Sequence, residues 1–84
     1  MKLEVVPKHF NNYCLRLGDF IEDDEEIIKL LDLSKDEYIK IMKKHHAKNV
    51  LDFSVCYYFE NREDAEKAVE ELSPYVVMLT LMGE

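Results

Sequence analysis

Glycine and proline are scarce in this chain, with two of each among 84 residues, and tryptophan is absent. So little glycine excludes the glycine-rich loops whose backbone amides hold phosphate groups in P-loop and dinucleotide-binding proteins. Because hydrophobic residues make up 48% of the chain, the scarcity of glycine and proline also excludes a disordered or low-complexity sequence. The sequence therefore predicts one folded domain over residues 1–84.

Long apolar runs are missing as well. The longest, Val76-Val77-Met78-Leu79, is far shorter than the roughly 20 residues that a membrane-spanning helix needs. The charged start of the chain predicts no signal peptide, and we expect a cytoplasmic protein that does not bind membranes. Only two cysteines are present, Cys14 and Cys56, without a CxxC pair. We expect both to be reduced, although a disulfide between them stays an open alternative.

Motifs that carry catalysis or bind metals are also absent. The sequence has no GxSxG, HExxH or EF-hand pattern. His45 and His46 are adjacent, so on a helix they point about 100° apart and are poorly placed to bind one ion together. The many carboxylates are better explained as solvated surface than as acid–base pairs. We therefore expect a protein without catalytic residues, cofactor or metal.

Hydrophobic periodicity predicts strands and helices in turn. Alternation of apolar and polar residues predicts strands over residues 1–6, ended by Pro7, over 13–17 and over 50–60. A helix is predicted over Glu22–Leu33, and a second from Ser34 to about Lys48, begun by a capping box of Ser34 and Glu37. A third helix is predicted from Asn61 to Ser73-Pro74. Tyr75–Met82, apolar on both faces, predicts a final strand.

This order, (β)-β-α-α-β-α-β, predicts the α+β class. We expect a two-layer sandwich of three to four mostly antiparallel strands, with the helices mainly on one face. Val50–Met82 is long enough for a strand–helix–strand crossover. Its small alanines on the helix and its valine-rich last strand resemble the second half of a ferredoxin-like plait, which implies that fold.

Charge is sorted by segment, and the segments sum to a net charge of −7. Nine acids between Asp19 and Glu37 stand against two lysines. From Tyr38 to Lys48 there are four lysines and two histidines but no acid, and residues 52–71 are acidic again. Such a balance repels nucleic acids and anionic membranes at long range and favours basic partners.

The acidic segments support the first functional hypothesis, a non-enzymatic protein-binding module. Its acids would engage a basic surface of a nucleic-acid-handling protein, as do small phage or mobile-element inhibitors that partly mimic DNA. A purely solubilising surface is the simpler interpretation. The acids assigned to this site are Asp19, Glu22, Asp23, Asp24, Glu25, Glu26, Glu63, Glu66 and Glu70.

Two alternatives stay open. A regulatory homodimer would form through the uncovered face of the sheet. Its candidate interface residues are Cys56, Tyr58, Val76, Met78 and Met82. A nucleic-acid binder would use a phosphate patch on the basic helix, made of Lys40, Lys43, Lys44 and Lys48. The acids at the start of that helix disfavour the second alternative, because a recognition helix reads bases near its N-terminus.

Overall fold

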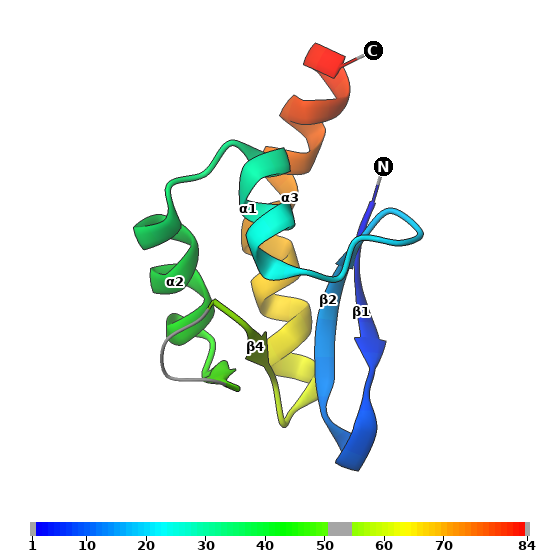
Figure 1. The fold of residues 1–84 in the computed structure, drawn as a ribbon, viewed down its shortest axis with the longest axis vertical. Coiled ribbons are helices and arrows are strands. Elements are labelled where there is room, and N and C mark those ends of the chain that lie inside the picture. The colour runs from blue at the N-terminus through cyan, green and yellow to red at the C-terminus, as the bar shows by residue number, and fades with distance from the viewer. Residues whose placement is uncertain (1, 51–54, 84) are drawn as a thin grey trace.

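The computed structural model describes residues 2–50 and 55–83, with side chains described as far as Val76. Within that part the chain forms three α-helices and two small antiparallel sheets, which confirms the predicted α+β class (Figure 1). The elements are β1 (Leu3–Pro7), a 3-10 turn (His9–Asn11), β2 (Tyr13–Leu17), α1 (Asp24–Leu31), α2 (Lys35–Lys44), β3 (Lys48–Asn49), β4 (Tyr57–Tyr58) and α3 (Arg62–Gly83). None of the described helices is long and apolar enough to cross a membrane.

Among the described residues, one pair joins the two sheets. β1 and β2 form an antiparallel hairpin in which Leu3 is opposite Leu17, and β3 pairs with β4 in the same sense. Tyr13, the first residue of β2, exchanges two backbone hydrogen bonds of 2.8 Å with Phe59, the residue after β4. This pair places the four strands in the spatial order β1-β2-β4-β3.

Local capping residues define where each helix begins. Ser34 Oγ accepts a hydrogen bond of 3.1 Å from the Glu37 amide, which confirms the predicted start of α2. The side chain of Asn61 accepts from the Glu63 amide at 2.8 Å at the start of α3. α2 ends at Lys44 rather than near Lys48, because His46 adopts a positive φ of 66° and the chain turns there toward β3.

The last segment of the chain is a helix, and the predicted strand over Tyr75–Met82 is wrong. α3 continues through Pro74 to Gly83. Its buried stripe explains the difference: Ala65, Ala68 and Leu72 are fully buried, and Val76 extends the same row by one turn. A short segment that is apolar on all sides fits a buried strand and a buried helix equally well by periodicity.

The strand predicted over residues 50–60 is present only in part. Tyr57–Tyr58 form β4, whereas Val55 and Cys56 have no regular structure and residues 51–54 lie outside the described part. The predicted alternation holds from residue 55 onward, because Val55, Tyr57 and Phe59 are buried and Cys56 is exposed. Without a final strand the strand–helix–strand unit is incomplete, so the ferredoxin-like arrangement is not confirmed.

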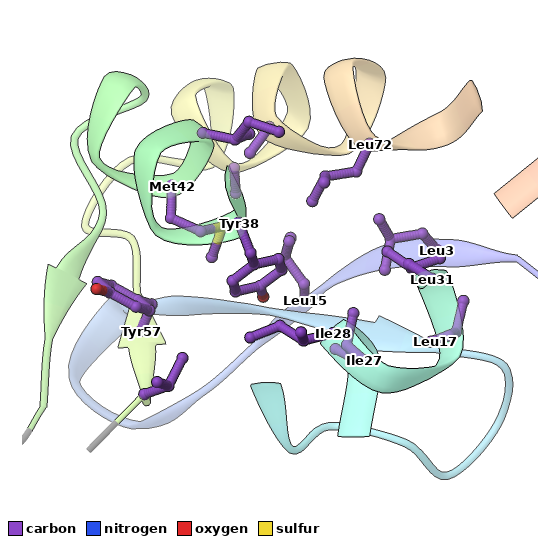
Figure 2. Close-up of a cluster of buried hydrophobic side chains, with 14 of the residues drawn as sticks. Leu3, Leu15, Leu17, Ile27, Ile28, Leu31, Tyr38, Met42, Tyr57 and Leu72 are labelled. Atoms are coloured by element: carbon purple, nitrogen blue, oxygen red, sulfur yellow. The ribbon is translucent and has the colours of Figure 1, made fainter. Parts of the chain in front are cut away.

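The core lies between the hairpin and the helices. α3 contacts both strands of the hairpin as well as α1 and α2, and Figure 1 shows it, in yellow to red, through the middle of the fold. Tyr38 reaches from α2 toward Leu15 and Ile28 in the centre of the buried cluster (Figure 2). Leu3, Leu15 and Leu17 are buried on the same sheet face, and α3 and α1 contact the hairpin.

Replacing Pro74 with alanine is expected to raise the free energy of unfolding by about 1 kcal/mol. Alanine restores the backbone N–H that proline lacks inside α3, and the greater freedom of the unfolded alanine chain offsets part of this gain. Urea unfolding followed by far-UV circular dichroism measures the change. Ser73→Ala is the control: it removes the hydroxyl that donates to the Val69 carbonyl at 2.7 Å and should not stabilise the protein. An unchanged or lower free energy of unfolding in Pro74→Ala would contradict a continuous α3, as would a clear gain in the helical signal of the folded protein.

Candidate protein-binding groove

The structure divides the predicted acidic residues between two places. Five of them surround the start of α1 and are exposed: Asp19, Glu22, Asp23, Glu25 and Glu26. Asp23 caps α1 by accepting a hydrogen bond of 3.1 Å from the Glu25 amide. Glu22 forms an ion pair with Lys8, whose hydrogen bond holds the pKa of the Glu22 carboxyl below its usual value. Two of these acids therefore already have a local role.

Asp24 does not belong to this acidic surface, because only 6% of it is exposed. One of its carboxylate oxygens accepts a hydrogen bond from the Tyr38 hydroxyl, and the other accepts from the Tyr57 amide at 2.8 Å. Burial raises the pKa of the Asp24 carboxyl, and these two hydrogen bonds oppose that rise. The sequence contained the signal for this position: Asp24 lies at the helical spacing of the buried residues Ile27, Ile28 and Leu31.

The second acidic place is a groove between β1 and the first half of α3. The groove has a volume of about 910 Å³. One wall is formed by residues 2–5 of the chain, and the other by Arg62, Glu63, Glu66, Lys67, Val69 and Glu70. Three of the predicted acids, Glu63, Glu66 and Glu70, therefore line one side of a single hollow. The contribution of β1 was not predicted, since no local pattern shows which strand will lie beside a helix more than 50 residues away.

Ion pairs neutralise only part of the groove. Arg62 pairs with Glu66 at 3.2 Å along the helix, and Arg16 reaches Glu4 at 3.1 Å across the hairpin. Within the described part of the chain, Glu63 and Glu70 form no ion pair, and they are exposed. The α3 wall therefore presents two carboxylates that are free to meet a partner, with Lys67 between them, and Lys2 adds a second lysine from the opposite wall.

Acids neutralise two of the four lysines in the predicted phosphate patch. Lys44 forms an ion pair of 2.8 Å with Glu71 of α3, and Lys48 forms one of 2.7 Å with Glu60. The hydrogen bond from Lys44 lowers the pKa of Glu71, and the one to Glu60 raises the pKa of Lys48. Lys40 and Lys43 are exposed on α2. Two isolated lysines are a weak phosphate site compared with the four that the sequence suggested.

The predicted dimer interface does not lie on one sheet face, because residues 75–82 belong to α3. Val76 is buried against the core with 6% exposure, so its assignment to an exposed sheet face is wrong. Met78 and Met82 are residues of α3 rather than of a strand, and their side chains lie outside the described part. Cys56 is exposed, and Tyr58 is half-buried and lines a separate hollow of about 460 Å³.

The chemistry of the thiols and histidines offers no second candidate. Cys14 and Cys56 are both free, and burial raises the pKa of each thiol, which disfavours the reactive thiolate. His45 lies 3.3 Å from Glu71, and His46 lies 3.6 Å from Asp64. Among the described residues no three side chains of histidine, cysteine or acidic type gather as metal ligands.

Comparison of the chain with known protein families, with curated protein sequences and with solved structures gives no significant match. The function proposed below therefore rests on the residues of this chain and their arrangement.

Proposed function

We propose that this protein is a non-enzymatic binding module whose β1–α3 groove engages a basic segment of a partner protein. The observation that carries the proposal is the placement of Glu63, Glu66 and Glu70 along one wall of the groove. These positions follow the i, i+3, i+7 spacing of one helix face and span about 10 Å. A row of carboxylates on a rigid helix is suited to pair with lysine and arginine side chains.

The long-range field supports the same kind of partner. With a net charge of −7, the protein attracts positively charged surfaces and speeds their association at low salt. Proteins that bind nucleic acid carry dense surfaces of lysine and arginine that neutralise phosphates, so we propose a nucleic-acid-handling protein as the target and inhibition as the outcome. The acids at the start of α1 that have no ion pair in the described chain, Asp19, Asp23, Glu25 and Glu26, would extend the attraction beyond the groove.

Charge reversal inside the groove tests the proposal. The tagged protein is used to capture partners from a lysate, and the captured protein is purified for titration at about 50 and 200 mM salt. The double variant Glu63→Lys with Glu70→Lys is expected to bind at least about tenfold more weakly at the lower salt and to lose part of the salt dependence.

A matched control separates the groove from total charge. Glu25→Lys with Glu26→Lys changes the net charge by the same amount at exposed positions of α1, outside the groove. This control should weaken binding only slightly. Equal losses from both double variants would mean that net charge alone attracts the partner, and the groove would not be its binding site.

A further inference from the structure

The backbone of β1 divides its hydrogen-bonding groups between two sides. The Lys2 carbonyl accepts from the Gly18 amide at 2.8 Å, and the Lys8 amide donates to the Asn12 carbonyl at 2.7 Å. In an antiparallel pair every second residue directs both its N–H and its C=O to the partner strand. With the observed register, the even-numbered residues 2–8 therefore point toward β2, and Leu3, Val5 and Pro7 point away from it.

The side that faces away from β2 is a free strand edge. No hydrogen bond is formed by the backbone groups of Leu3 or Val5 on this side within residues 2–50 and 55–83. Figure 1 shows β1 as the outermost strand, with β2 on its inner side. Pro7 has no N–H and limits the usable edge to the N–H and C=O of Leu3 and Val5, together with the Pro7 carbonyl. An open edge of this kind is a template for pairing with another chain.

The groove lies along this edge. A neighbouring strand runs about 4.8 Å from the strand it joins, so a segment added to β1 would lie beside α3. The groove has a volume of about 910 Å³, which is at the upper end of the usual range for binding pockets. Val5 and Val69 supply apolar surface, Glu63 and Glu70 supply negative charge, and Lys2 and Lys67 supply positive charge. A strand edge beside a helix wall is the arrangement that peptide-binding domains use for strand addition.

We propose that an extended basic segment of the partner binds in this groove as an additional antiparallel strand on β1. Partner residue i would exchange a pair of hydrogen bonds with Val5, and residue i+2 would exchange a pair with Leu3. Directly paired residues share a sheet face, so the side chains of i and i+2 point to the same side as those of Leu3 and Val5, which is the side of α3. Lysine or arginine fits there, with its stem over Val5 and Val69 and its charge at Glu63 and Glu70.

This inference deepens the proposed function and rests on it. It adds the binding mode, strand addition, and a partner pattern in which two basic residues are separated by one residue that faces the opposite side. A second copy of this chain is the competing occupant. The charges disfavour this occupant. If the β1 strands of two copies paired antiparallel about Glu4, the two Glu4 side chains would lie directly opposite each other, and like charges in that position are destabilising.

Backbone methylation of a synthetic peptide tests the binding mode. The probe is an N-acetylated, C-amidated heptapeptide that alternates threonine and lysine, beginning with threonine. In the bound strand the lysine amides point toward β1 and the threonine amides point away. Methylation of the lysine amide nitrogens is therefore expected to weaken binding at least about tenfold, and methylation of the threonine amide nitrogens should leave it nearly unchanged. The methylated threonines are the three that follow the first residue, so the two peptides carry the same charge and three added methyl groups each.

Amide hydrogen exchange of the ¹⁵N-labelled protein gives an independent measurement without any variant. At saturating unmethylated peptide, exchange at Leu3 and Val5 should slow at least about tenfold, with little change at the already paired Glu4 and Val6. Equal binding of the two methylated peptides, or unchanged exchange at Leu3 and Val5, would overturn strand addition.

The outcomes also separate this inference from the proposed function. Binding that survives lysine methylation but is lost in Glu63→Lys with Glu70→Lys would support an acidic groove and overturn the added strand. No binding of the probe at about 1 mM would overturn strand addition even if a lysate partner depends on the groove. Light scattering that shows a dimer, with Leu3 and Val5 already protected in the free protein, would assign the edge to a second copy and overturn it as well.

Discussion

Replacing Asp24 with alanine is expected to lower the free energy of unfolding by about 2–3 kcal/mol. The carboxylate connects three elements: it begins α1, accepts from the Tyr38 hydroxyl of α2, and accepts from the Tyr57 amide of β4. Its removal leaves a buried hydroxyl and a buried amide without acceptors, each at a cost of about 1–3 kcal/mol. Relief from burying a charge offsets part of this loss.

Two conservative variants show whether the hydrogen bonds cause the loss. Asp24→Asn keeps the shape and one acceptor oxygen, and Tyr38→Phe removes only the hydroxyl; each is expected to cost about 1–2 kcal/mol in urea unfolding. Because the two groups bond each other, the costs should not add in the double variant. Strict additivity would show that Asp24 and Tyr38 stabilise the fold independently.

The pH dependence of stability gives a second test at Asp24. Burial raises the pKa of this carboxyl above its ordinary value of 3.8, so the folded protein holds the proton over a pH range in which the unfolded chain has lost it. The contribution of Asp24 to stability is therefore largest below that ordinary value and declines as pH rises through the folded-state pKa. The stability difference between the wild type and Asp24→Asn should decrease over this window. A difference that grows with pH would mean that the two hydrogen bonds outweigh burial.

Local signals account for most of what the sequence predicted correctly. The caps at Ser34 and Asn61 act within three residues, so the starts of α2 and α3 are visible in the sequence and confirmed in the structure. The hairpin strands were predicted for the same reason, since alternation over residues 13–17 reports directly on which side chains are buried. Asp24 shows that helical periodicity can predict burial even for a charged residue. It lies at the spacing of the apolar stripe of α1 and is buried with that stripe.

Long-range pairing accounts for what the sequence did not predict. Tyr75–Met82 has no pattern that separates a strand from a helix, and its conformation depends on whether a strand is available for pairing beside it. β4 contains only two residues, while the stripe of Ala65, Ala68 and Leu72 already provides a buried path that Val76 continues. The groove likewise depends on β1 lying next to α3, a contact between residues about 60 positions apart in the chain.

Replacing Phe59 with alanine is expected to lower the free energy of unfolding by about 4 kcal/mol. Phe59 is fully buried, and its backbone forms the two hydrogen bonds that join β4 to β2. Alanine keeps these backbone bonds and removes the ring, so the loss isolates the packing of the side chain. A domain of this size has a total stability of about 5–10 kcal/mol, and the variant should therefore be close to unfolding at room temperature.

Two other phenylalanines provide matched controls for the same substitution. Phe10 and Phe20 are 92% and 90% exposed, and alanine at either position is expected to change stability by less than about 0.5 kcal/mol. Phe59→Leu should cost about 1 kcal/mol, since it retains most of the buried volume. Thermal and urea unfolding measure all four variants on one scale. A loss at Phe59 no larger than at Phe10 would mean that the backbone hydrogen bonds hold the two sheets together without help from the packing of the Phe59 side chain. A large loss in Phe59→Ala that Phe59→Leu mostly avoids would show that the buried volume of this side chain stabilises the fold at the junction of β4 with β2.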